Sequence, residues 1–163
     1  HFPAIDWLKS YSLYNDIVRK NIAENIDSNW QEHTRRSSAL LQEEASLLEI
    51  VQLVGIDTLS SKDRSTLHAA RMLREDYLQQ NAFDEIDTYT SLYKQTKMLD
   101  VIIRWYDSAL AVIAKGVKYE KVEFLDVNER IGKMKYSTEE QFDKEYKNIL
   151  EHLEFEFNRL VKE

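Results

Sequence analysis

The sequence contains no cysteine, one proline and only three glycines. The lack of cysteine excludes disulfides and thiolate metal sites. β-Sandwiches and β-barrels need many Gly and Pro turns, so the scarcity of both residues favours an all-helical chain. No stretch fits the G-x-x-x-x-G-K-[ST] pattern of a phosphate-binding loop.

A basic excess and long apolar runs are absent as well. Lys and Arg number 22 against 29 Asp and Glu, so the net charge is −7, whereas a nucleic-acid backbone binder normally carries a positive excess. The longest apolar run has six residues, 109–114, and a membrane-spanning helix needs roughly 20. We therefore expect a soluble acidic domain with no nucleic-acid partner and no direct membrane insertion. The chain begins at His1 without a signal-peptide pattern, which we interpret as a start inside a longer protein.

Apolar residues recur at helical spacing in four long segments, which predicts substantial helices over 37–54, 60–77, 86–115 and 137–163. The first of these stripes consists of Leu40, Leu41, Leu47, Leu48, Val51 and Val54. Ser60 with Asp63, and Ser137 with Glu140, fit capping boxes at two helix starts, and Gly55 fits a helix stop.

Weaker patterns fill the remaining chain. They predict a short helix or turn over 6–20, little periodicity over 24–36, a brief turn over 119–122 and a short helix over 127–133. Since the long helices are joined by short links, we predict an all-α, antiparallel helical bundle.

Residues that could carry chemistry are scattered. The histidines His33, His68 and His152 have no second ligand at helical spacing, so we interpret them as structural. The acid pairs 43–44 and 139–140 are typical of solvated helix faces and helix N-termini. The sequence therefore predicts no catalytic residue and no metal site in this chain.

Two segments fit this plain pattern less well. One is the aromatic–proline start, 1–7; the other is Gln79–Phe83, a lone aromatic among amides between two long helices. An adenine ring needs flat apolar faces and a few amides at its edge, and Phe2, Phe83 and Gln80 are residues of those types. Ordinary packing of these side chains is the alternative interpretation at this point.

Four segments resemble a known family. They are HFPAIDWLKSYSLY from His1, LLEIVQLVG from Leu47, REDYLQQNAFDEIDTY from Arg74 and ERIGKMKYSTEEQF from Glu129. Together they are similar to the C-terminal part of the catalytic A subunit of V-type and archaeal-type rotary ATPases. This resemblance implies that 1–20 is the trailing edge of a nucleotide-binding domain with its connector, and that 21–163 is a C-terminal helical bundle.

The resemblance also implies an adenine pocket. Phe2-Pro3-Ala4-Ile5-Asp6 is similar to a stretch in the catalytic beta subunit of F-type ATP synthase whose aromatic stacks on adenine. The implied pocket has Phe2 on one face and Phe83 on the other, with Pro3 and Gln80 nearby. One residue more separates Tyr77 from Phe83 here than in that beta subunit.

A rotor-contacting tip is implied in the same way. The F-type beta subunit carries D-E-L-S-E-E-D at a hairpin tip, and the matching residues here are Asp57, Thr58, Leu59, Ser60, Ser61, Lys62 and Asp63. Thr58, Ser61 and Lys62 lack the acids of that motif, so a steric lever fits better than an electrostatic push. A plain solvent-exposed turn is the alternative interpretation.

The implied activity belongs to a whole complex. ATP synthesis or hydrolysis would be coupled to proton or sodium transport, with ATP or ADP and Mg²⁺ bound by parts upstream of this chain. No cofactor is expected in the chain alone. The implied partners are non-catalytic B subunits and the central rotor stalk, in a peripheral membrane complex at the cytoplasmic face. A stand-alone helical interaction module without nucleotide chemistry is the alternative, and a nucleic-acid-binding helical protein is a weaker one.

Overall fold

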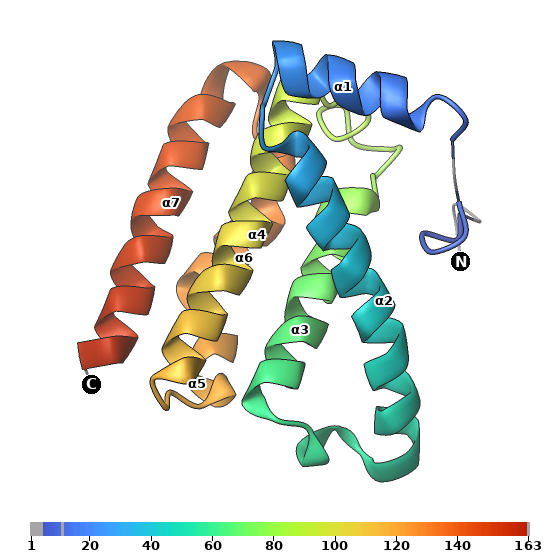
Figure 1. The fold of residues 1–163 in the computed structure, drawn as a ribbon. Coiled ribbons are helices and arrows are strands. Elements are labelled where there is room, and N and C mark those ends of the chain that lie inside the picture. The colour runs from blue at the N-terminus through green and yellow to red at the C-terminus, as the bar shows by residue number, and fades with distance from the viewer. Residues whose placement is uncertain (1–4, 11, 163) are drawn as a thin grey trace.

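The structure is a computed structural model that describes residues 5–10 and 12–162, and all regular structure in that part is helical (Figure 1). The α-helices are α1 (Asn15–Asn25), α2 (Trp30–Val54), α3 (Ser61–Met72), α4 (Leu92–Ala114), α5 (Tyr119–Glu123), α6 (Asp126–Lys133) and α7 (Glu139–Lys162). The predicted all-α bundle is confirmed.

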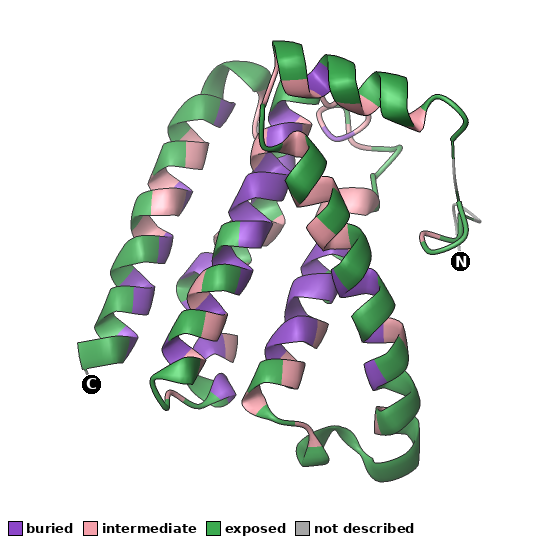
Figure 2. Ribbon diagram, viewed as in Figure 1, coloured by how far each residue is buried: buried purple, intermediate pink, exposed green. Residues whose placement is uncertain are grey.

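Helix α4 is the centre of the bundle. It packs against α2, α3 and α7, and most of its residues from Met98 to Tyr106 are buried (Figure 2). Successive long segments reverse direction, but α6 carries the chain back before α7 starts, so α7 runs parallel to α4 (Figure 1). Trp105, Ile102 and Ile149 are fully buried at the contact of these helices.

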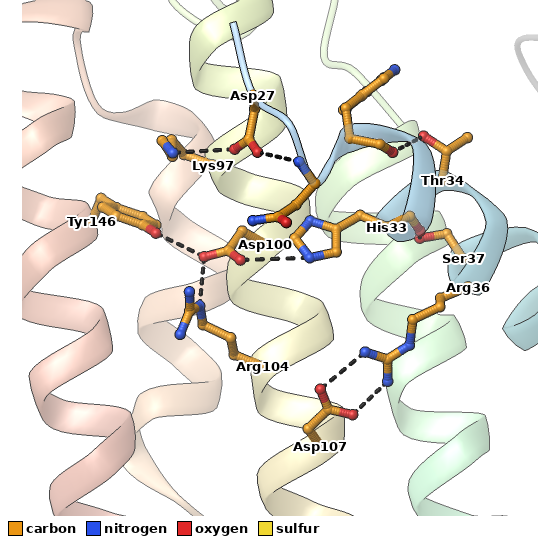
Figure 3. Close-up of polar contacts among 12 residues, drawn as sticks. Asp27, His33, Thr34, Arg36, Ser37, Lys97, Asp100, Arg104, Asp107 and Tyr146 are labelled. Carbon is orange, nitrogen blue, oxygen red and sulfur yellow. Dashed lines mark hydrogen bonds and ion pairs between the residues drawn. The ribbon is translucent and has the colours of Figure 1, made fainter. Parts of the chain in front are cut away.

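Helix α2 starts at Trp30, earlier than the prediction at 37. The stretch 30–36 carries no apolar stripe. It is attached to α4 by polar contacts. His33 Nε2 lies 3.7 Å from Asp100 Oδ1, and Arg36 makes a two-pronged ion pair with Asp107 (Figure 3). Contacts of this kind leave no hydrophobic periodicity in the sequence.

Helix α4 starts at Leu92, later than the prediction at 86. Residues 79–91 form turns that the Asp84 side chain closes, since its Oδ1 accepts hydrogen bonds from the backbone N–H of Ile86 and Asp87 at 2.9 and 2.8 Å. Ser91 then caps the helix by accepting from the Lys94 N–H at 3.1 Å.

The second predicted helix begins as expected and ends differently. Ser60 Oγ accepts from the Asp63 N–H at 3.1 Å, which confirms this cap. After Met72 the helix continues as a π-helix, Leu73–Leu78. The other predicted cap is wrong by one residue, because α7 begins at Glu139 and Thr138 precedes it.

The apolar stripe of α2 leaves the core halfway. Leu40, Leu41 and Leu47 are buried as predicted, but Leu48 and Val54 are exposed. The last turns of α2 lie apart from α4 and next to the start of α3 (Figure 1). The hairpin of α2 and α3 therefore extends beyond the core. Within the described part of the chain, no helix is long and apolar enough to cross a membrane.

Candidate functional site

The predicted adenine-facing residues fall partly outside the described residues. Phe2 and Pro3 belong to the undescribed start of the chain, so their pairing with Phe83 stays a prediction. Gln80 and Phe83 are described, and both lie on the segment 79–91 between the π-helix and α4.

Phe83 points into solvent from an ordered turn. Its side chain is 99% exposed, and its backbone N–H donates to Asn81 Oδ1 at 3.1 Å. Such exposure is unusual for a phenyl ring, because burying a large apolar side chain is worth roughly 1.5–3 kcal/mol. Within residues 5–10 and 12–162, Phe83 therefore does not serve as core packing.

Gln80 and Asn81 hold this turn closed against Asp87. Gln80 Nε2 donates to the Asp87 carbonyl oxygen at 3.1 Å, and the Asn81 N–H donates to Asp87 Oδ2 at 2.6 Å. The Asp87 side chain is almost fully buried. The segment that carries Phe83 is thus a hydrogen-bonded loop with a defined shape.

Two buried lysines stabilise this loop through hydrogen bonds to backbone carbonyl groups. Lys135 Nζ donates to the carbonyl oxygens of Glu75 and Gln79, both at 3.0 Å, and lies 3.9 Å from Asp87 Oδ2. Lys94 Nζ donates to the carbonyl oxygens of Lys135 and Ser137, both at 2.7 Å. Burial lowers the pKa of Lys94. Sequence reasoning missed these lysines, because their partners lie 41 to 60 residues away along the chain.

An open hollow lies beside Phe83. Its lining includes Gln79, Gln80, Ala82 and Tyr136 as well as Phe83. The hollow thus combines amide groups and two aromatic rings with the charged side chains of Glu75 and Lys135.

The predicted hairpin tip lies on the surface between α2 and α3, at the end of the hairpin away from segment 79–91. Gly55 ends α2 at φ +85°, a conformation that glycine adopts at little cost. A 3₁₀ turn, Ile56–Thr58, follows, and Thr58 Oγ1 donates to the Gly55 carbonyl oxygen at 2.8 Å. Of the predicted tip residues, 57–58 lie in this turn, 59–60 link it to α3, and 61–63 lie in the first turn of α3.

The surface next to the tip is apolar. The exposed side chains there are Ile50, Leu53, Val54 and Ile56, and Leu53 is 84% exposed. They form what we call the apolar ridge at the end of α2. An apolar ridge of this kind is a surface that other molecules contact by shape and burial more than by charge.

One nearly continuous helical rod joins the two candidate regions. In Figure 1 the tip lies at the bottom of the molecule and segment 79–91 lies at the top, near α1. Helix α3 and the π-helix run between them over residues 61–78. At roughly 1.5 Å per residue, this rod is about 27 Å long.

A buried carboxylate at Asp100 ties three long helices together (Figure 3). Its Oδ2 accepts from Tyr146 Oη at 2.7 Å and from Arg104 Nε at 2.6 Å, while its Oδ1 faces His33 of α2 at 3.7 Å. The pKa of Tyr146 is raised by burial and by this hydrogen bond. A nearby ion pair joins Lys97 to Asp27 at 3.2 Å. These contacts fix α2 and α7 against α4.

One predicted surface acid is buried, which corrects the interpretation of the pair 43–44. Glu44 is only 6% exposed and accepts two hydrogen bonds from Arg74 Nε and one from its Nη2, at 2.9 to 3.1 Å. The pair joins α2 to the π-helix. The hydrophobic periodicity did not indicate this burial, because a paired carboxylate takes the place of an apolar residue on the inner face of α2.

The remaining histidines have structural partners. His68 contacts Tyr119 and Arg71, and His152 contacts Arg130 at 3.4 Å. Among the residues that the structure describes, no group of three or more His, Asp or Glu side chains is arranged to hold a metal ion.

Comparison with known proteins places these features in a family. The family model described as "C-terminal domain of V and A type ATP synthase" matches residues 19–123. The chain belongs to this family.

Curated relatives of this C-terminal domain carry one name. The V-type ATP synthase alpha chain of Acetivibrio thermocellus is 48% identical over 161 residues, which is 99% of this chain and 27% of the relative. Those of Thermoanaerobacter sp. (strain X514) and Clostridium botulinum (strain Hall) are 47% and 51% identical, over 94% and 88% of this chain and 27% and 24% of each relative. The chain thus spans about a quarter of the length of these relatives.

Proposed function

We propose that this chain is the C-terminal part of the catalytic subunit of a rotary ATP synthase or ATPase. In the complete complex, ATP synthesis or hydrolysis is coupled to proton or sodium transport at the cytoplasmic face of a membrane. ATP or ADP with Mg²⁺ binds mainly to the upstream nucleotide-binding domain, of which residues 1–20 are the trailing edge. Family membership and the name shared by the relatives support this proposal.

The chain contributes an aromatic face to the adenine pocket. Phe83 supplies one face and Phe2 the other, with Pro3 and Gln80 at the edge. The single observation that carries this role is the fully exposed Phe83 ring on a turn fixed by hydrogen bonds. An aromatic held out in this way is ready to stack on a base without further ordering.

The chain also contributes a mechanical lever. The hairpin tip, 57–63, contacts the central rotor stalk, and the helical rod over 61–78 links that contact to the nucleotide pocket. Non-catalytic B subunits flank the domain in the complex. The His33–Asp100 contact and the Arg74–Glu44 ion pair stiffen the lever, since they fix α2 to α4 and to the π-helix.

Replacing Phe83 with alanine in the complete subunit tests the adenine role. Base–aromatic stacking is worth about 1–3 kcal/mol, so KM for ATP should rise about 10-fold while kcat changes less than about two-fold. Steady-state ATPase kinetics of the assembled complex measure both constants.

Phe124→Ala is the matched control, because Phe124 is also largely exposed but lies beyond α5, at the other end of the molecule. This control should leave KM unchanged, and Phe83→Trp should keep it near the original value. An unchanged KM in Phe83→Ala would remove Phe83 from the nucleotide pocket.

A further inference from the structure

We infer that Lys135, acting with Asp87, is a positioning residue that holds the Phe83 loop in its nucleotide-ready shape. This inference rests on the proposed adenine role of Phe83. Lys135 lines the same hollow as Phe83, and its ammonium group contacts the backbone of the π-helix and the Asp87 carboxylate.

The first step of the argument is the end of the π-helix. Carbonyl groups at a helix C-terminus have no partner inside the helix, and a cation there is favoured by the helix dipole. Lys135 Nζ donates to two of these carbonyls, Glu75 and Gln79, at 3.0 Å each. Its side chain is 10% exposed, so water competes little for these bonds. Lys135 thus sets the point where the helix ends and the loop begins.

The second step is the buried pair with Asp87. The Asp87 side chain is 3% exposed and its Oδ2 lies 3.9 Å from Lys135 Nζ. Removing one partner of a buried ion pair leaves an uncompensated charge, which is strongly unfavourable. Without Lys135, Asp87 would therefore turn toward solvent and break its present contacts.

The third step connects Asp87 to the aromatic ring. Asp87 accepts hydrogen bonds from the Asn81 N–H and, through its carbonyl oxygen, from Gln80 Nε2. Asn81 in turn accepts from the Phe83 N–H. The direction of Phe83 therefore depends on Asp87, and the place of Asp87 depends on Lys135. A loop that must first be ordered binds its ligand more weakly, because the free-energy cost of ordering reduces the free energy of binding.

The place of Lys135 itself is also fixed. Lys94, which is fully buried, donates to the Lys135 carbonyl oxygen at 2.7 Å and anchors this part of the chain to α4. The positioning group is therefore attached to the centre of the bundle, and the loop it holds is attached through it to the core.

The test uses the assembled complex with Lys135→Met. KM for ATP should rise about five-fold or more with kcat within about two-fold. The inhibition constant of inorganic tripolyphosphate with Mg²⁺, a competitor that has phosphates but no base, should stay unchanged. A general folding defect would weaken both ligands, so equal losses for ATP and tripolyphosphate would overturn the inference.

Lys133→Met is the matched control. Lys133 lies two residues away, is exposed and pairs with Glu129 on its own helix, so KM should not change. Asp87→Asn keeps the size and one oxygen acceptor but removes the charge that faces Lys135. This variant should also raise KM for ATP, and its KM provides the test if the complex with Lys135→Met does not assemble.

A double variant separates this inference from the proposed function. If Lys135 acts through Phe83, adding Lys135→Met to Phe83→Ala should raise KM no further. A full additive increase would overturn the positioning role. A raised KM in Phe83→Ala with normal KM in Lys135→Met and Asp87→Asn would overturn the inference alone, whereas normal KM in Phe83→Ala would overturn the proposed adenine role and the inference with it.

Discussion

At the scale of single residues, His68 shows how burial sets charge. Its ring is 4% exposed, lies 4.6 Å from the Trp105 ring, and has hydrogen-bond partners on both nitrogens, Tyr119 Oη at 3.0 Å and Arg71 Nη2 at 3.2 Å. Burial, with a smaller contribution from the charge of Arg71, lowers the pKa of His68 from 6.5 to about 4. Because Arg71 can only donate, Nε2 accepts and Nδ1 carries the proton.

This histidine predicts a loss of stability in mild acid. Between pH 6.5 and about 4 the unfolded chain binds a proton at His68 and the folded chain does not. Stability therefore falls as pH falls through this window, by up to about 3 kcal/mol at its lower end. Urea unfolding of the chain at pH 7 and 4.5 measures this change.

His68→Gln isolates the contribution. The variant should be less stable at pH 7, because the packing against Trp105 is reduced. The difference in unfolding free energy between the two chains should be smaller by about 2 kcal/mol at pH 4.5 than at pH 7, since glutamine takes up no proton. Parallel pH curves for the two chains would contradict the assignment.

Residues whose partners are distant could not be found from the sequence. The adenine role of Phe83 is implied by the family resemblance, and its local pattern, a lone aromatic among amides, left ordinary packing as the alternative. Asp100 and Lys135 give no local signal, because a single charged residue on a helix normally faces water and only the fold shows that it is paired. Whether Phe2 meets Phe83 stays a prediction.

At the scale of elements, Gly55 decides how α2 ends. It has φ +85° and ψ 158°, and a Cβ there would meet nothing within 4 Å. The cost of any other residue is therefore backbone strain and not a clash. This region of φ and ψ is essentially restricted to glycine, with a cost of order 1–3 kcal/mol for others.

Gly55→Ala should destabilise the chain by about 1–2 kcal/mol, measured by urea unfolding. Gln52→Ala, an exposed substitution in the last turn of the same helix, should stay within about 0.5 kcal/mol. Equal stabilities of the two variants would show that the turn relaxes without strain.

Helix bounds followed from the sequence where apolar packing defines them. The Ser60 cap before α3 and the helix α7 were predicted because a cap and an apolar stripe are local patterns. The predicted starts of α2 at 37 and of α4 at 86 were wrong, because polar contacts of α2 with α4 and the side chain of Asp84 decide where these helices begin. The π-helix had no sequence signal at all.

At the scale of the whole molecule, the hairpin projects from the core and ends in an apolar ridge. Leu53 and Ile56 are exposed there, so polar replacements should not unfold the chain. If the tip transmits force by shape, the double substitution Leu53→Ser with Ile56→Ser should lower ion transport per ATP hydrolysed several-fold. KM for ATP should remain normal, because the nucleotide segment lies at the other end of the rod (Figure 1).

Asp57→Asn is the control for this lever in the assembled complex. It removes an acid from the tip without changing its size, so coupling should stay near normal if the contact is steric. A collapse of nucleotide affinity with intact coupling in the double serine variant would assign the tip to a different role.

The π-helix at 73–78 has a consequence for how the chain tolerates a change in its length. Its wide turn accommodates one residue more than an α-helix would, between the hairpin tip and segment 79–91. Deleting a single codon here would restore a regular α-helix, and because the wide turn absorbs the extra residue, the segment beyond it would keep nearly its present direction. A one-residue deletion within the regular helix α3 would instead turn everything beyond it by about 100° relative to the tip, so the two neighbouring stretches of one rod should tolerate changes in length very differently.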